Sequence, residues 1–500
     1  MMPILFSILR CILTQLLLNI SYSMFRNMTL EDNKYLWRLI MLCLLSVPPT
    51  LVLGQSTDEK TPAEKVFYAW LSAINSGSAQ QLEAYKAAYH KKWAVQTMLD
   101  SWERTGGYRV VRVEKSEPLN FTVLIEEKES DALHRENVAV DTSGNDINVK
   151  MTIEDISRPS DLAIHRLSQS EAIQSLIRRT DTLTRAGRFS GAVLVASGNK
   201  VLLNRAWGEM DKEKHVLNTI HTQFRNGSMN KMFTAIAILQ LVEKGKVALD
   251  STVGDYIKDY PNKDIARVTV RRLLNHTGGT GDIFGPEFDA NRTSLRDNSD
   301  YVKLYGSRGP DQSKGFSYSN YGFVLLGEIV SRVSHMSYYS YIDKYIFKPA
   351  NMNSTGELPE NVHLPMRAPG YMRVKGAWVR NDETLPYRGM AAGGGYSTVD
   401  DMLRFVNALQ AGKLISKTML DLAIKPYFHD APSGYGYGLG FELYGDKQLI
   451  SFGHEGGADG MNGELRVFPK MNRVIVVLSN LDPPAAHRLV DYYSLRMPVK

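Results

Sequence analysis

The chain has 500 residues, of which 43% are hydrophobic and 22% charged, and its 59 basic and 53 acidic residues give a formal net charge of +6. This is ordinary globular composition, and the length allows a core large enough to need no metal or disulfide to stabilise it. The charge excess is small and no basic run accompanies it, so nucleic acid is excluded as an expected partner.

Residues 1–54 have the layout of an export signal. A basic flank, Lys34 and Arg38, precedes an apolar run over residues 39–45, and small or turn-forming residues follow up to Gly54. This order is typical of a secretory signal peptide, and the alternative is a membrane anchor. We therefore expect an exported protein, periplasmic or extracellular, that is either free or attached to the membrane through this segment.

Residues 55–160 are expected to form a small α+β accessory domain. The periodicity predicts a helix over 61–75 and a second over 79–103, followed by alternating strands between residues 108 and 153. This unit is similar to the cone-shaped nuclear transport factor two-like modules. No residue pattern in it indicates catalysis, and we interpret its tryptophans as core residues. These are Trp70, Trp93 and Trp102.

Residues 161–500 are expected to form a second domain in which strands flank a helical insertion. A helix over 162–183 precedes two strands, and a mainly helical stretch then reaches residue 349. Strands return near the C-terminus, and the run 473–480 is continuously apolar, as in a central strand. One sheet built from both ends of the domain, together with an all-helical lobe, fits this order. The expected strands are 189–196, 200–207, 438–443, 463–468 and 473–480.

Ser228 and Lys231 stand three residues apart at the head of an apolar helix. Side chains at this spacing share a helical face, so a hydroxyl and an amine can meet there. The chemical interpretation is a nucleophile with its base, and the alternative is a helix N-cap with a lysine that reaches solvent. Ser197 and Lys200 have the same spacing, but they lie between two apolar strands and indicate a hairpin turn.

Three short motifs in order give this pattern a specific interpretation. The first surrounds Ser228 and Lys231, the second is Tyr318-Ser319-Asn320, and the third is His454-Glu455-Gly456. Together they resemble the motifs of the serine beta-lactamase-like superfamily, which includes class C beta-lactamases, D-alanyl-D-alanine carboxypeptidases, D-aminopeptidases and related esterases. The resemblance implies an α+β beta-lactamase/transpeptidase-like catalytic domain, with an antiparallel sheet flanked by helices and an all-helical lobe.

The resemblance also implies a role for each site residue. Ser228 would be the nucleophile, and Lys231 and Tyr318 would move the proton. Asn320, His454 and Gly456 would bind substrate or supply electrostatic stabilisation. The backbone N–H groups of Ser228 and Gly457 would hold the oxyanion. His276 precedes a Thr-Gly pair and so also matches the His-x-Gly pattern, but it would be a structural histidine. No cofactor is expected, and no His/Asp cluster has metal-ligand spacing.

The sequence therefore predicts a serine hydrolase that acts through an acyl-enzyme on a small-molecule or peptide substrate, an amide or an ester. His454 would be a cation that titrates near neutrality. Glu455 replaces the usual threonine, which disfavours penicillin-like carboxylates. One alternative is a true beta-lactamase of the class C type, and another is a non-hydrolytic binding or scaffold protein on this fold. The sequence leaves the oligomeric state open.

Overall fold

The computed structural model describes residues 60–89, 92–141, 148–312, 314–431, 433–445 and 448–499. The expected signal or anchor over residues 1–54 lies outside these ranges. Within them, no helix combines the length and the apolar character that crossing a bilayer requires.

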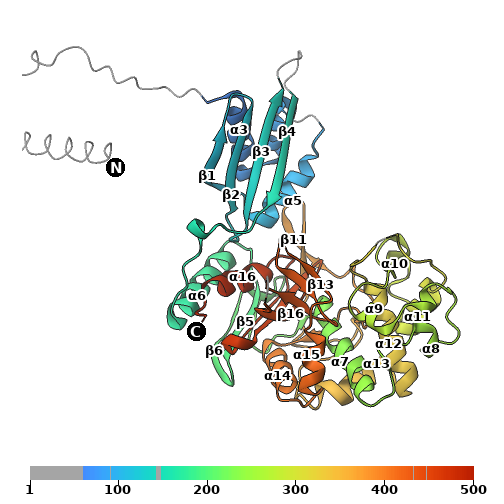
Figure 1. Ribbon diagram of the computed structural model, residues 1–500. Coiled ribbons are helices and arrows are strands. Elements are labelled where there is room, and N and C mark those ends of the chain that lie inside the picture. The colour runs from blue at the N-terminus through green and yellow to red at the C-terminus, as the bar shows by residue number, and fades with distance from the viewer. Residues whose placement is uncertain are drawn as a thin grey trace, which may run out of the picture. The chain divides into compact units, whose positions relative to one another are not determined.

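The first described unit packs three helices on one face of a four-stranded antiparallel sheet of order β1-β2-β3-β4 (Figure 1). It has a hydrophobic core of its own. The single helix predicted over 79–103 is wrong, because Ala94 has an extended backbone and a new helix starts after it. The elements are α3 (Pro62–Ser76), α4 (Ala79–Tyr89), α5 (Val95–Thr105), β1 (Tyr108–Ser116), β2 (Asn120–Glu127), β3 (Leu133–Asp141) and β4 (Asn148–Asp155).

The rest of the chain is organised around an eight-stranded sheet. All its neighbouring strands are antiparallel, and the strand β18 of the C-terminal part pairs with β5 of the earlier part. The expectation of one sheet built from both ends of the domain is thereby confirmed. The strands, in spatial order, are β13 (Phe428–Asp430), β14 (Tyr435–Tyr437), β15 (Glu442–Tyr444), β16 (Ser451–Ala458), β17 (Met461–Phe468), β18 (Arg473–Ser479), β5 (Gly191–Ser197) and β6 (Lys200–Trp207).

Helices cover both faces of this sheet, because successive residues of its central strands point to opposite sides. On β5, Val193 and Val195 pack with α6 and α16, whereas Ala192 and Leu194 pack with α7 and α14. Strand β5 is therefore buried without alternation, and so is β18, which covers most of the run 473–480 for which the sequence predicted this. The helices next to the sheet are α6 (Gln169–Arg185), α7 (Asn230–Glu243), α14 (Val399–Gln410), α15 (Lys417–Ala423) and α16 (His487–Arg496).

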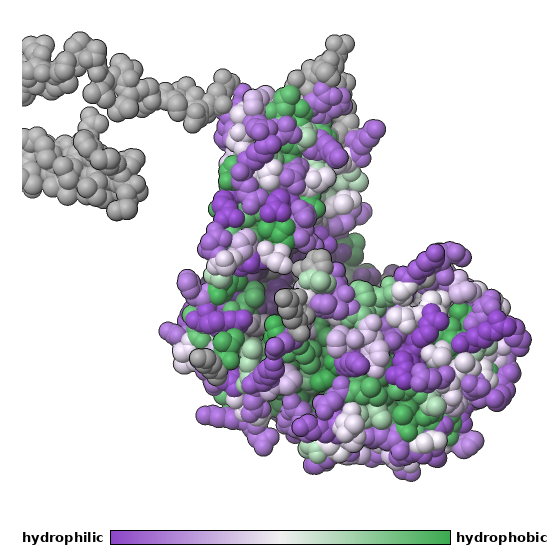
Figure 2. Space-filling view, viewed as in Figure 1, coloured by the Kyte–Doolittle hydropathy of each residue, from purple (hydrophilic) through white to green (hydrophobic). Residues whose placement is uncertain are grey.

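A helical lobe lies on the other side of α7, as expected (Figure 1). Hydrophilic side chains cover much of its visible face (Figure 2). It consists of α8 (Val253–Tyr256), α9 (Val270–Leu274), α10 (Pro286–Asn291), α11 (Asn298–Tyr305), α12 (Asn320–Ser334), α13 (Tyr338–Ile342) and the π-helical η4 (Asp343–Phe347). The short remaining elements are η1 (Ser160–Leu162), β7 (Glu209–Asp211), β8 (Val216–Leu217), β9 (Phe224–Arg225), η2 (Gly227–Met229), η3 (Ile265–Arg267), β10 (Gly370–Val374), β11 (Ala377–Asn381), β12 (Tyr396–Ser397) and η5 (Pro469–Met471).

Candidate active site

Ser228 and Lys231 lie at the start of the buried central helix. Ser228 belongs to the 3-10 turn η2, and α7 begins two residues later, so the serine precedes the α-helix on which the sequence placed it. The spacing still brings the side chains together, with Lys231 Nζ 3.1 Å from Ser228 Oγ. Residues 230–241 are all buried, which anchors this turn between the sheet and the helical lobe. Ser197 and Lys200 instead face each other across the β5–β6 hairpin.

Two glycines allow strand β16 to approach the turn that carries Ser228. Gly227 has φ +53°, and a Cβ added there would lie 3.0 Å from Gly457 N. A Cβ on Gly456 would lie 2.1 Å from Asn226 O and 3.0 Å from Ser228 N. Larger residues would therefore separate the two segments. The close approach places the Ser228 and Gly457 backbones side by side, as an oxyanion hole requires.

The Lys231 amine is fully buried and makes three polar contacts. Its Nζ donates to Ser228 Oγ at 3.1 Å, to Asn320 Oδ1 at 2.7 Å and to the Ala392 carbonyl at 2.5 Å. Burial disfavours the charged form and lowers the pKa of Lys231 to about 7, although Asp282 and Glu442 favour the charge. A substantial fraction of this lysine is therefore neutral at physiological pH.

Asn320, the first residue of α12, is oriented by a carboxylate that the sequence analysis did not identify. Its Nδ2 donates to both carboxylate oxygens of Asp282 at 3.1 Å, and its Oδ1 then faces Lys231. Because a carboxylate only accepts, this contact determines which end of the amide points to the lysine. Nothing in the sequence links Asp282 to Asn320, which follows it by 38 positions.

Tyr318 forms the wall of the site opposite the serine. Its ring centroid lies 4.7 Å from Lys231 Nζ, and 4.3 Å from the ring centroid of His276. Burial raises the pKa of the Tyr318 phenol, and a hydrogen bond with Ser228 opposes the rise. The phenol is therefore protonated near neutrality. His276 accepts a hydrogen bond from Ser319 N at 3.1 Å through Nδ1, so its contacts support the Tyr318 wall.

The sequence predicted that His454 would be a cation titrating near neutrality, and this prediction is wrong. The side chain is fully buried, and burial together with Lys231 lowers the pKa of His454 to about 3. Its Nε2 lies 2.9 Å from the Tyr437 hydroxyl and its Nδ1 lies 2.6 Å from the Glu455 carbonyl. The neutral imidazole points from β16 into the core and is not among the residues that line the cavity next to Ser228.

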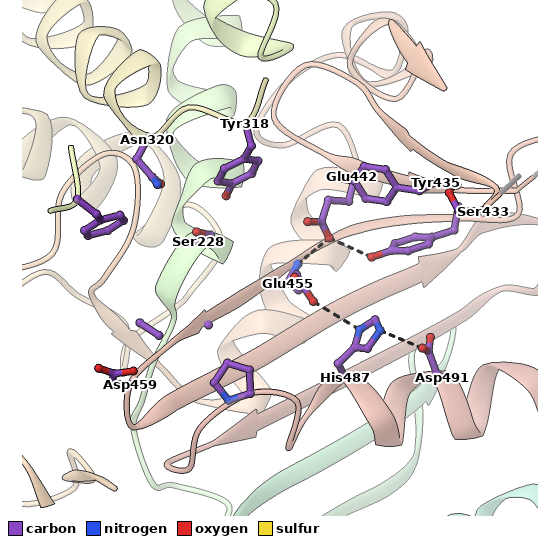
Figure 3. Close-up of a pocket in the computed structure, with 15 residues that line it drawn as sticks. Ser228, Tyr318, Asn320, Ser433, Tyr435, Glu442, Glu455, Asp459, His487 and Asp491 are labelled. Atoms are coloured by element: carbon purple, nitrogen blue, oxygen red, sulfur yellow. Dashed lines mark hydrogen bonds and ion pairs between the residues drawn. The ribbon is translucent and has the colours of Figure 1, made fainter. Parts of the chain in front are cut away.

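A cavity of about 870 Å³ opens onto Ser228 (Figure 3). Tyr318, Asn320 and Gly457 line it next to the serine, and Glu455 extends into it from β16. Side chains alternate along β16, so His454 points to the core and Glu455 points from the opposite face into the cavity. Among the described residues that line this cavity, none is a lysine or an arginine. The acidic lining residues are Glu442, Glu455, Asp459 and Asp491.

The far end of the cavity contains an ionic cluster that the sequence analysis also missed. His487 Nδ1 lies 2.8 Å from Glu464 and its Nε2 lies 3.0 Å from Asp491. Burial alone would lower the pKa of His487, but these two carboxylates raise it well above the usual value. His487 and Asp491 stand four residues apart in α16, which brings them together, but only the tertiary fold brings α16 next to Glu455.

The same cluster contains a group that could hold a metal ion. Ligand atoms of Glu455, Glu464 and His487 lie within 4.8 Å of one another. The sequence showed no such group because strands β16 and β17 and helix α16 contribute one residue each. In the structure His487 and Arg466 already bind Glu464, so the donors have partners. The absence of a metal from the active site therefore stays a prediction of the sequence.

Comparisons with known proteins bear on the family and the fold of the chain. The family model described as Beta-lactamase matches residues 173–496. Penicillin-binding protein 4* of Bacillus subtilis (strain 168) is 30% identical over 323 residues, which cover 60% of this chain and 70% of that protein. The crystal structure of a penicillin binding protein from Bacillus halodurans is 28% identical, with a TM-score of 0.58 over 62% of this chain and 98% of that chain. A D-amino acid amidase from Ochrobactrum anthropi has the same fold at 24% identity, with a TM-score of 0.54 over 65% of this chain and 97% of that chain.

Proposed function

Because the chain belongs to the beta-lactamase family and is a serine hydrolase, we propose that it cleaves an amide, peptide or ester through an acyl-enzyme on Ser228. One observation carries the proposal: the buried Lys231 amine lies 3.1 Å from Ser228 Oγ, and that serine lines a cavity large enough for a substrate. A serine hydroxyl is a weak nucleophile and needs a base at this distance.

Lys231 is the group that we assign as the base. The neutral amine has two N–H bonds and one lone pair. Asn320 Oδ1 and the Ala392 carbonyl are acceptors, so they take the two N–H bonds and leave the lone pair for the proton of Ser228. The pKa shifts support this choice, because burial lowers the pKa of Lys231 to about 7 and raises that of Tyr318.

The reaction then follows from the placement of these groups. Ser228 Oγ attacks the substrate carbonyl while Lys231 takes its proton, and the oxyanion forms toward the backbone N–H groups of Ser228 and Gly457. Tyr318, which is protonated, passes its proton to the leaving group and regains one from Lys231. Water then attacks the acyl-enzyme by the reverse proton path, which releases the acid and regenerates Ser228.

The charge of the cavity supports a substrate without a carboxylate near the scissile bond. Glu455, Asp459 and Asp491 line the cavity, and His487 and Arg466 are the cations paired with Asp491. Burial raises the pKa of Glu455, although the charge of His487 opposes the rise, and the side chain lacks the compact hydroxyl of the threonine it replaces. We therefore propose weak or no beta-lactamase activity, with a peptidase or esterase substrate instead. Because some relatives are named penicillin-binding proteins, we propose that penicillin at most acylates Ser228 slowly.

Export is part of the proposal. The signal-like residues 1–54 support a periplasmic or extracellular protein, either free or attached to the membrane through that segment. N-terminal sequencing of secreted material tests this, and a mature start near Gln55 or Ser56 is the expected result.

The deciding experiment labels the purified protein with a fluorophosphonate and with a fluorescent penicillin. We expect a covalent adduct on Ser228 in the wild type and none in Ser228→Ala, with Ser197→Ala as the matched control that keeps full labelling. Folded wild-type protein that takes neither label at Ser228 contradicts the proposal and supports a non-hydrolytic binding protein. Fast turnover of the penicillin adduct supports the class C alternative.

A further inference from the structure

The unit formed by residues 62–155 contains a cavity of about 490 Å³. This volume lies within the range of roughly 300–1,000 Å³ that is usual for small-molecule sites. Two tryptophans and a tyrosine line it, Trp70, Trp93 and Tyr108, and Met98 and Met151 add to the apolar wall. Trp70 and Tyr108 are stacked with ring centroids 5.5 Å apart. The tryptophans that we interpreted as plain core residues thus include two that border a cavity.

Glu136 is the buried charged residue of this lining, whose other polar members are Lys92, Thr97 and Ser101. It lies on the inward face of β3 in register with Val138 and Val140, which belong to the hydrophobic core. Its neighbour across β2 is Val123, and its neighbour across β4 is Ile153. Such a position normally holds an apolar residue, because burying a carboxyl is costly. Glu136 is nevertheless only 3% exposed.

The Glu136 carboxyl forms no hydrogen bond or ion pair with any residue that the structure describes. The other deeply buried glutamate of this sheet, Glu126 on β2, is 4% exposed and pairs with Arg109 and Arg158. Burial without such a partner raises the pKa of Glu136 to about 8. A buried acid that faces an apolar cavity and has no partner is poised to receive one from a ligand.

We propose that this cavity binds a hydrophobic amine whose ammonium group pairs with Glu136. A cation satisfies the carboxylate by a charge-assisted hydrogen bond, and a lining rich in aromatic residues also favours cations. The apolar wall accommodates a ring or a short aliphatic group. Lys92 is the other charged lining residue in the described part of the chain, and it is exposed. The site is separate from Ser228, so the proposal does not rest on the hydrolase reaction.

Isothermal titration of the full chain with three probes of one shape tests the proposal. The probes are 1-naphthylmethylamine, 1-naphthalenemethanol and 1-naphthoate. We expect the amine to bind at least about tenfold more tightly than the alcohol, and the acid to show no binding, because a charge-assisted hydrogen bond contributes about that factor. Equal affinities for all three, or no binding of the amine at millimolar concentration, would overturn the proposal.

Two variants assign the binding to this cavity. Glu136→Gln keeps the side-chain shape and should weaken the amine about tenfold while leaving the alcohol unchanged. Ile153→Trp fills the cavity from a position that is 47% exposed, and should weaken both probes even if Glu136→Gln fails to fold. Glu117→Gln, an exposed change in the same unit, and Ser228→Ala should bind the amine like wild type. Unchanged amine affinity in both Glu136→Gln and Ile153→Trp would refute the site.

Discussion

Asp282 accepts two hydrogen bonds of 3.1 Å from the side-chain amide of Asn320, and so turns the Asn320 oxygen toward the Lys231 amine. The lysine contact with Asn320, at 2.7 Å, is therefore supported by a residue of the loop between α9 and α10. An amide can bind through either end, and the carboxylate, which only accepts, favours the orientation that leaves Oδ1 facing Lys231. Asp282 thus acts as a positioning residue for the base.

Removing this carboxylate should slow acylation. In Asp282→Ala the Asn320 amide can turn, and its nitrogen would then face Lys231 in place of its oxygen. We expect kcat/KM for a neutral ester to fall on the order of 100-fold, the size typical of a misplaced catalytic group. Asp289→Ala, an exposed aspartate in α10, is the matched control. Equal rates for the two variants would show that Asp282 does not orient the base.

The pH dependence of kcat/KM should report Lys231. The neutral amine is the active form, and burial lowers the pKa of Lys231 to about 7, so kcat/KM should rise across pH 6 to 8 and then level off. No fall is expected up to pH 9, because burial raises the pKa of Tyr318. Pre-steady-state acylation of a neutral ester at constant ionic strength measures this. A rate that falls across this range would contradict Lys231 as the base.

Substitution of Lys231 provides the companion test. Lys231→Ala removes the base and Lys231→Arg supplies a group that stays protonated, so neither should acylate at a measurable rate. Circular dichroism and thermal unfolding establish that each variant is folded. Acylation by either folded variant at the wild-type rate would exclude the lysine from the proton path.

Glu455 should control the preferred charge of the substrate. Glu455→Thr removes a negative charge from the cavity and supplies a hydroxyl, so we expect acylation by a fluorescent penicillin to accelerate about tenfold. Glu455→Gln removes the charge alone and separates the two effects. The wild type should prefer a cationic ester over an anionic ester of the same size. Penicillin acylation that is the same in all three proteins would show that Glu455 does not contact the substrate carboxylate.

Gly456 should tolerate no side chain. A Cβ there would lie 2.1 Å from Asn226 O, so Gly456→Ala must push β16 away from the turn that carries Ser228. We expect acylation to be lost and the free energy of unfolding to fall by about 1–3 kcal/mol, as in other overpacked sites. Gly309→Ala, where an added Cβ meets nothing within 4 Å, is the control. Wild-type acylation by folded Gly456→Ala would contradict the close approach.

The local order of the chain could be derived from the sequence because it depends on short-range rules. Hydrophobic periodicity located strands β5, β6, β17 and β18, although it predicted none over β13, β14 or β16. The i, i+3 spacing joined Ser228 to Lys231. Boundaries were less well predicted. The helix expected over 79–103 is two helices, because the extended backbone at Ala94 leaves little trace in the residue pattern. The strand expected over 438–443 starts only at Glu442, after Gly440 with φ +81°.

Protonation states and long-range partners could be read only from the tertiary structure. The sequence identified His454 as a titratable group, but the burial of its side chain on the core face of β16 keeps it neutral. It singled out neither Asp282 nor Glu136, because a carboxylate acquires its role from the amide beside it or from the lack of any partner. The sequence thus determined which side chains are available and in which order. The fold decided their solvation and distances, which determine the pKa values and the contacts.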